Sequence, residues 1–355
     1  MLQPITSFLS PALVVARGAA RSSLPIIGCN AVVTSTQLRG HANDIFLQRA
    51  CINDLNKLIH NSSTSSYYPP QLLSLIEDAA EEERGSTLSD KMYGDVTREV
   101  ASFMLQYSAD AAKVDRMTSE EVYNPTLLDM YDALVWGFNS PFLWRITQQD
   151  IESLYKSNIS KHHCEIAVGT GLFLSEDVSS TCDSIKLIDL NENSLDSCEK
   201  RIQSTYSGEA GGDAKDGPSI SKLVADIMIQ PEEKSSLTHL QGTFQSVAAN
   251  FLLHCLHGSN LHEKENAIRN CALLIDPENG VFFGSTILGK EMVCDEKNAG
   301  ETAMHVLRRF NDAGVFGNLG DSMEDLEFVL KNNFDDVDLW NVGYCGVWAA
   351  RNPKC

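Results

Sequence analysis

The feature that most constrains the fold is a regular alternation, from residue 164 onward, of short apolar runs with segments at helical spacing. The seven apolar runs read EIAVG, SIKLIDL, KLVADI, FQSVAANFLLH, GVFFGSTIL, DVDLWNVG and CGVWAAR. Strands that alternate with helices form a parallel sheet with helices on both faces. A short gap near Gly343 separates the last two runs, which predicts an antiparallel hairpin at the sheet edge. We therefore expect an α/β chain with a Rossmann-like, doubly wound, seven-stranded sheet.

The segment before this alternation has a different pattern. Apolar residues recur there at helical spacing, and helices are predicted over 44–60, 71–84 and 95–113. Residues 44–150 are therefore expected to form a helical N-terminal cap, and residues 151–355 a single sheet domain.

The first 43 residues contain Arg17, Arg21 and Arg39 but no acidic residue. Arginine with serine, threonine and alanine, in the absence of acids, is typical of organelle transit peptides. A secretory signal fits less well because no positive charge precedes the apolar stretch FLSPALVVA. We predict an organelle leader over residues 1–43, with the mitochondrion ahead of the plastid. A disordered leader on a cytoplasmic protein is the alternative.

Composition narrows the classes of partner. The 355-residue chain carries a formal charge of −20, and such an acidic surface repels nucleic acid and anionic membranes. No apolar run approaches the roughly 18 residues that a membrane helix needs. The ten cysteines form no CxxC pair and have no zinc-ligand spacing, so no metal is expected. Oligomeric state is not predicted.

The stretch EIAVGTG, residues 165–171, ends a predicted strand and opens a helix, and its small residues allow close approach of a ligand. Phe173 and Leu174 stand where a dinucleotide fingerprint needs its third glycine, and the GK[ST] of a P-loop is absent. A carboxylate just before the small residues suits a cationic ligand group rather than a pyrophosphate.

Polar residues also end the three following strands. Asp189 lies eighteen residues after Gly171 and suits ribose hydroxyls. Asp226 suits an adenine amino group, and Asn250 is expected beside the cleft. Together the residues at these strand ends predict a ligand that contains a cationic group, a ribose and an adenine.

In these motifs the chain resembles the class I S-adenosylmethionine-dependent methyltransferases. The resemblance implies that Glu165 orients the loop near the methionine amino group, that Asp189 binds the ribose, and that Asp226 with Ile227 binds the adenine. Ala167 replaces a glycine that many members have. The implied cofactor-binding residues are Glu165, Ala167, Gly169, Thr170, Gly171, Asp189, Leu190, Asn191, Asp226, Ile227 and Asn250.

A closer resemblance is to small-molecule methyltransferases of the type 12-like subset. Three segments carry it: YDALVWGFNSPFLWR at 131–145, NFLLHCLHG at 250–258, with His257 in place of a proline, and GSTILGK at 284–290. It implies transfer of a methyl group to O, S or N of a small metabolite. The alternatives are a non-catalytic assembly or binding protein of the same fold and, less favoured, a nicotinamide-dependent oxidoreductase. The [DN]PP[YF] signature of nucleobase enzymes is absent.

Four further residues are candidates for chemistry or substrate contact. His254 follows the fourth strand and titrates near neutral pH, so it is the candidate general base, with a structural histidine as the alternative. Tyr131 is expected to line the site, because a sulfonium group attracts the faces of aromatic rings. Arg145 and Asn311 are candidate substrate contacts, with an ordinary ion pair and a solvated helix face as the respective alternatives.

Overall fold

The computed structural model describes residues 68–85, 131–206, 216–230 and 236–354, together with isolated positions between 52 and 128. All of them belong to one compact unit, Leu38–Cys355. The predicted leader of residues 1–43 lies outside the described residues, as do most positions of the predicted helices at 44–60 and 95–113. The leader, the location in a mitochondrion and the helical cap therefore stay predictions.

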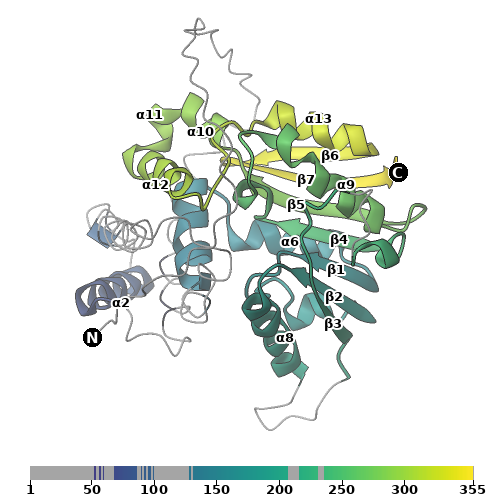
Figure 1. Cartoon of the computed structure of the whole chain (residues 1–355). Helices are drawn as coiled ribbons and strands as arrows, with labels where there is room; N and C mark the ends of the chain where they lie inside the picture. The colour runs from purple at the N-terminus through teal and green to yellow at the C-terminus, as the bar shows by residue number, and fades with distance from the viewer. Residues whose placement is uncertain are drawn as a thin grey trace, which may run out of the picture. The chain divides into compact units, whose positions relative to one another are not determined.

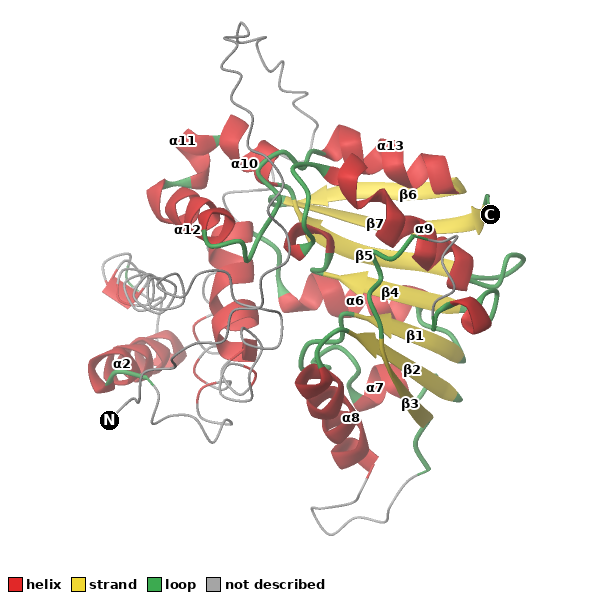
Figure 2. Cartoon of the chain, in the orientation of Figure 1, coloured by secondary structure: helices red, strands yellow, loops and turns green. Residues whose placement is uncertain are grey.

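Seven strands form one sheet in the order β3-β2-β1-β4-β5-β7-β6 (Figures 1 and 2). They are β1 (His162–Ile166), β2 (Ser184–Asp189), β3 (Ser219–Val224), β4 (Ser246–Asn250), β5 (Val281–Ile287), β6 (Phe334–Val342) and β7 (Cys345–Pro353). The first five are parallel, and β7 runs antiparallel between β5 and β6. The predicted doubly wound sheet with a closing hairpin at its edge is confirmed.

Helices cover both faces of the sheet, and each face has its own core. On one face, α6 (Gln148–Asn158) and α8 (Glu192–Tyr206) pack in the same apolar cluster as Ile185 and Leu187 of β2. On the other, α9 (Glu265–Leu274) and α13 (Met323–Asn333) pack with alternate positions of the strands. The two-residue alternation of strand side chains is what divides the apolar residues between the two cores.

Shorter elements connect these layers. They are α7 (Glu176–Ser179), η4 (Thr238–Leu240), η5 (Leu253–Cys255), η6 (Leu261–Lys264), α10 (Gly289–Cys294), α11 (Glu296–Ala299) and α12 (Glu301–Asp312). Before the sheet, α2 (Pro70–Gly85) matches the helix predicted over 71–84, and η3 (Asp132–Trp144) is a π-helix. None of the helices within the described part of the chain has the length and apolar character needed to cross a membrane.

Local sequence explains several boundaries. Thr147 and Asp150 form a reciprocal capping box at the start of α6, so the predicted domain boundary between residues 150 and 151 falls inside this helix. Gly343 makes the β6–β7 turn with φ +57°, and a Cβ there would collide with the carbonyl oxygens of Trp144 and Arg145. The hairpin turn therefore requires glycine.

Candidate functional site

The loop after β1 is a compact turn with three left-handed positions. Ala167, Gly169 and Gly171 have φ values of +59°, +53° and +72°. The Ala167 N–H donates to the carbonyl of Ile188 at 2.9 Å, and the Gly171 N–H to that of Val168 at 3.0 Å. Ala167 adopts a conformation that costs an L-residue roughly 1–2 kcal/mol, which glycine avoids.

The two glycines of this loop have different surroundings. A Cβ on Gly171 would lie 2.7 Å from Sγ and 3.1 Å from Cα of Cys198 on α8. A Cβ on Gly169 would meet only Cε1 of Tyr131, at 4.0 Å. Gly171 is therefore needed for helix packing, whereas Gly169 borders open space.

This difference predicts unequal stability losses. Gly169→Ala is expected to cost about 1 kcal/mol of unfolding free energy, from the left-handed backbone alone. Gly171→Ala is expected to cost about 2 kcal/mol more, because the collision with Cys198 adds overpacking strain. Urea unfolding followed by circular dichroism measures both values. Equal losses in the two variants would contradict the assignment.

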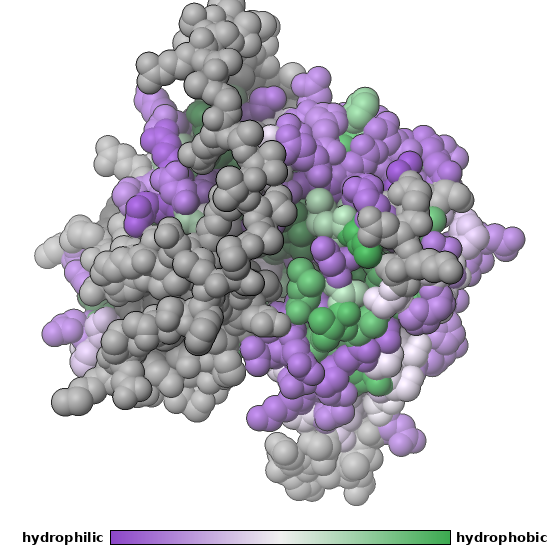
Figure 3. All heavy atoms as spheres, viewed as in Figure 1, coloured by the Kyte–Doolittle hydropathy of each residue, from purple (hydrophilic) through white to green (hydrophobic). Residues whose placement is uncertain are grey.

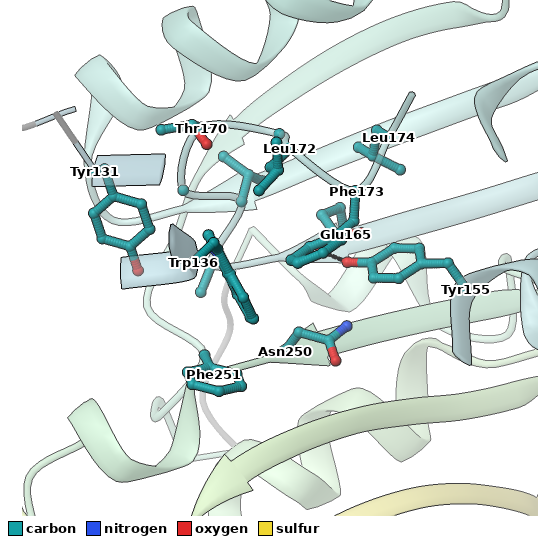
Figure 4. A pocket seen from close by; sticks show the side chains of 14 residues that line it. Tyr131, Trp136, Tyr155, Glu165, Thr170, Leu172, Phe173, Leu174, Asn250 and Phe251 are labelled. Carbon is teal, nitrogen blue, oxygen red and sulfur yellow. Dashed lines mark hydrogen bonds between the residues drawn. The ribbon is translucent and has the colours of Figure 1, made fainter. Parts of the chain in front are cut away.

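A pocket of about 410 Å³ opens where the glycine loop, η3 and the end of β4 meet (Figure 4). Seven predicted site residues line it: Tyr131, Glu165, Ala167, Gly169, Thr170, Gly171 and Asn250. Four lining aromatic residues, Trp136, Tyr155, Phe173 and Phe251, were not predicted as site residues. The Trp136 ring contacts the Phe173 and Phe251 rings edge-on, at 4.5 and 4.7 Å between centroids.

Glu165 is the ionisable acid that lines this pocket, and it is buried. Tyr155 donates to its Oε1 at 2.5 Å, and His163 Nε2 lies 3.0 Å from its Oε2. Asn250 lies across the pocket, where its Oδ1 accepts a hydrogen bond from Ser285 at 3.1 Å. The Nδ2 of Asn250 is buried and makes no hydrogen bond of normal geometry to any described residue, although the Tyr155 hydroxyl lies near enough to interact with the Asn250 side chain. The pocket thus offers both an anionic acceptor and an unused donor to a ligand.

Asp189 ends β2 next to the glycine loop. Burial raises the pKa of its carboxyl to about 6, although hydrogen bonds from backbone N–H groups oppose the rise. The donors include the N–H of Asn191, at 2.8 Å, and amides of Val168 and Gly169 in the glycine loop. The acid is thereby tied to the loop, although it does not itself line the pocket.

The other strand-end residues extend the same edge of the sheet. Leu190 is 48% exposed, and Val224, which pairs with Asp189 in register, is 52% exposed. Figure 3 shows that one face of the molecule carries hydrophobic (green) surface bordered by hydrophilic (purple) surface. Asp226 is exposed and accepts the N–H of Met228 at 2.8 Å, as in an Asx turn.

Two predicted residues of this edge are buried. Asn191 accepts the N–H of Asn193 at 2.8 Å, at the start of α8. The carbonyl of Ile227 accepts a hydrogen bond from Asn270 at 2.7 Å. The Asn191 side chain and the Ile227 backbone therefore help to hold the edge, and the contact of either residue with a ligand stays a prediction.

His254 lies outside the pocket lining and is buried. Its ring contacts Phe251 and Phe316 edge-on, and its Nδ1 lies 3.4 Å from Oγ1 of Thr286. Burial, with the nearby charge of Lys264, lowers the pKa of the imidazole to about 3. This environment favours the structural alternative, and the role of general base stays a prediction.

The two candidate substrate contacts have partners within the protein. The exposed Arg145 donates to the carbonyl of Asn298, and its guanidinium lies 5.1 Å from the centroid of the Tyr344 ring. Asn311 exchanges hydrogen bonds with Asn318, at 2.9 and 3.0 Å. The structure does not bring either residue to the pocket lining.

The sequence analysis did not identify a partly buried group of hydrogen-bonded side chains beside the pocket, here called the clamp, which consists of Asp132, Thr170 and Arg201. Thr170 donates to Oδ1 of Asp132 at 2.5 Å, and Arg201 of α8 pairs with Oδ2 of the same carboxylate at 2.5 Å. The clamp ties the start of η3, next to Tyr131, to the glycine loop and α8. The dipeptide Tyr131-Asp132 was visible in the sequence, but its partner Arg201 is distant in the chain.

No family model matches the chain, but curated relatives do. O-methyltransferase NEC2 of Pyricularia oryzae is 28% identical, over 66% of this chain and 92% of that protein. Demethylluteothin O-methyltransferase of Streptomyces thioluteus is 27% identical, over 68% and 97%. The uncharacterised protein YbcY of Escherichia coli (strain K12) is 31% identical, over 63% and 98%. Each match is longer than residues 151–355, so it extends into the segment before the sheet.

The fold and the pocket define an α/β protein with a glycine loop after the first strand of a mostly parallel sheet and acids after the next two strands. The relatives make the class specific: the chain belongs to the class I S-adenosylmethionine-dependent methyltransferases. The resemblance seen in the sequence is confirmed, and so is the predicted fold class.

Proposed function

We propose that the chain transfers the methyl group of S-adenosylmethionine to an O, S or N atom of a small molecule held against the aromatic side of the pocket. The observation that carries the proposal is the juxtaposition of Glu165 and the unpaired Asn250 amide with the open space beside Gly169. An amino acid moiety presents an ammonium group and a carboxylate, which need such an acceptor and such a donor.

The remaining parts of the cofactor would fit the adjoining edge. Asp189 would accept hydrogen bonds from the ribose hydroxyls, as acids after the second strand do in nucleotide-binding sheets. The exposed Leu190 offers an apolar surface to a flat ring, and Asp226 an acceptor for its amino group. The fit is supported by residues at the ends of two neighbouring strands, β2 and β3.

S-adenosylmethionine supplies a methyl group already activated on a sulfonium. The protein then has to align the acceptor atom for in-line displacement, exclude water and stabilise the positive charge. Tyr131, Trp136 and Phe251 present aromatic faces and edges to the pocket, and ring faces attract a sulfonium. Burial raises the pKa of Tyr131, so its phenol stays protonated and neutral. A base is required only where the acceptor atom carries a proton to lose.

The relatives support a small-molecule acceptor. Two of the three are named as O-methyltransferases, and one of these names specifies demethylluteothin as its substrate. These names favour oxygen without excluding sulfur or nitrogen for this chain.

The test is calorimetric titration of the full chain with S-adenosylmethionine and S-adenosylhomocysteine, followed by incubation with fractionated metabolite extracts. We expect micromolar binding of both, and formation of S-adenosylhomocysteine with a methylated product 14 Da heavier, detected by mass spectrometry. Absence of binding by a chain shown to be folded would overturn the proposal. Tight binding without turnover in any extract would instead support the non-catalytic alternative.

A further inference from the structure

β1 carries two polar side chains into the core under the pocket, which is unusual for a strand in the middle of a parallel sheet. His163 has no exposed surface and Glu165 is 4% exposed. Both point to the face covered by α6, where Tyr155 is also buried. Buried polar groups of this kind cost several kcal/mol unless they are paired, so their hydrogen bonds have to be accounted for.

The pairing is complete and runs in one line. The N–H of Ser160 donates to Oγ of Ser246 at 3.0 Å, and this Oγ lies 2.9 Å from Nδ1 of His163. Nε2 of His163 lies 3.0 Å from Oε2 of Glu165, and the Tyr155 hydroxyl donates to Oε1 at 2.5 Å (Figure 4 shows this last bond). Glu165 is where both donors converge.

The hydrogen-bonded line allows a proton arrangement with a neutral ring in which each contact pairs one donor with one acceptor. Because the Ser246 oxygen already accepts from a backbone N–H, its own proton is free to go to Nδ1 of His163. The imidazole then carries its proton on Nε2 and donates it to Glu165. Burial raises the pKa of Tyr155, so the phenol keeps its proton and remains a donor. The side chains stacked on or edge-on to the imidazole are Phe283 and Tyr155, both uncharged.

Two donors that converge on the two oxygens of one buried carboxylate fix its orientation. Each carboxylate oxygen keeps a second lone pair, and Glu165 lines the pocket. We propose that His163 is a positioning residue for cofactor binding: with Ser246 and Tyr155, it holds the Glu165 carboxylate aimed at the ammonium group of the methionine moiety. This inference rests on the proposed function and adds the residues that set its charged contact.

The test compares two ligands that share the ribose and adenine and differ in the methionine moiety. S-adenosylmethionine carries the amino acid moiety, whereas 5′-methylthioadenosine has the ribose and adenine but no ammonium group. His163→Phe retains a flat ring for Phe283 and removes the donor. We expect it to weaken S-adenosylmethionine binding by roughly 10- to 100-fold, the usual effect of a charge-assisted hydrogen bond, and 5′-methylthioadenosine binding by less than about twofold.

Three variants sharpen this comparison. His163→Gln restores an N–H donor and is expected to recover most of the affinity. Ser246→Ala removes the group that sets the tautomer, and is expected to produce a smaller loss that is again confined to S-adenosylmethionine. His162→Phe is the matched control, because His162 is the exposed neighbour that bonds Ser184 on β2 at 2.9 Å. All are measured by calorimetry on chains whose circular dichroism and thermal midpoint show a folded state.

The outcomes separate three cases. A selective loss in His163→Phe with recovery in His163→Gln supports the inference. Equal weakening of both ligands shows a merely structural role and overturns it, as does unchanged affinity for S-adenosylmethionine. If His163→Phe does not fold, Ser246→Ala decides between the same results. Failure of the unmutated chain to bind either ligand would instead remove the proposed function on which the inference rests.

Discussion

At pH 5, S-adenosylmethionine is expected to bind the full chain about tenfold more weakly than at pH 7.5. The cause is Asp189, whose carboxyl pKa burial raises to about 6. Ribose hydroxyls donate hydrogen bonds best to the ionised carboxylate, so the anionic form is the one that binds. One unit below the pKa only about a tenth of the molecules are ionised, and the apparent Kd rises by that factor. Calorimetric titration across pH 5–8 measures the slope.

Asp189→Asn is the matched control. It keeps the shape of the side chain, is expected to weaken binding at pH 7.5 by roughly 10- to 100-fold, and should flatten the pH dependence. The titration of Asp189 itself does not destabilise the fold at pH 5. A folded-state pKa raised above the ordinary 3.8 makes the contribution of Asp189 to stability largest at low pH, and that contribution is lost as pH rises through 6. The same pH slope in Asp189→Asn would contradict the assignment.

Lys264→Met is expected to reduce the unfolding free energy by about 3–5 kcal/mol. Lys264 and Asp321 form an ion pair at 2.6 Å, and neither side chain has any exposed surface. The lysine also donates to the carbonyl of Gly317 at 2.8 Å, so it joins η6 to the loop before α13. Removal of the lysine leaves Asp321 buried without its counter-charge. Urea unfolding followed by circular dichroism gives the difference.

Two controls accompany this measurement. Arg308→Met breaks the pair with Glu296, whose side chains are 53% and 54% exposed, and is expected to change stability by less than about 1 kcal/mol. The double variant Lys264→Met with Asp321→Leu removes both buried charges and is expected to regain most of the loss. Burial lowers the pKa of Lys264 and raises that of Asp321, because the charged form of each group is removed from water. A loss in Lys264→Met no larger than in Arg308→Met would be contrary to this expectation.

The sheet could be predicted because its signals are local. Apolar runs, their spacing and the glycine at the last turn lie within a few residues of each other, and the seven strands appear where the runs stand. The exact ends of the strands were harder to predict from the sequence than their existence. β1 begins at His162, before its apolar run, because polar side chains there find partners in Ser184 and Ser246 on neighbouring strands. It ends before Ala167, whose positive φ leaves the extended conformation.

The site was predictable to the same extent. The glycine loop depends on residues close in sequence, and it lines the pocket, whereas the contact of Asp189 with a ligand stays a prediction. Arg145 and Asn311 depend instead on Asn298 and Asn318, which only the folded chain brings to them. The burial of His254 likewise depends on Phe316. The π-helical form of η3 has no signal in a 3.6-residue periodicity.

The position of β7 also bears on how the chain is made. β7 lies between β5 and β6, although it is the last of the seven strands to be synthesised. Every residue of β5 is buried in the finished sheet, so one edge of this buried strand stays unpaired until Cys345–Pro353 has left the ribosome. At ordinary elongation rates that interval lasts roughly 3 to 12 s. During translation, this is when the nascent chain is most prone to pair with another polypeptide and most dependent on chaperones.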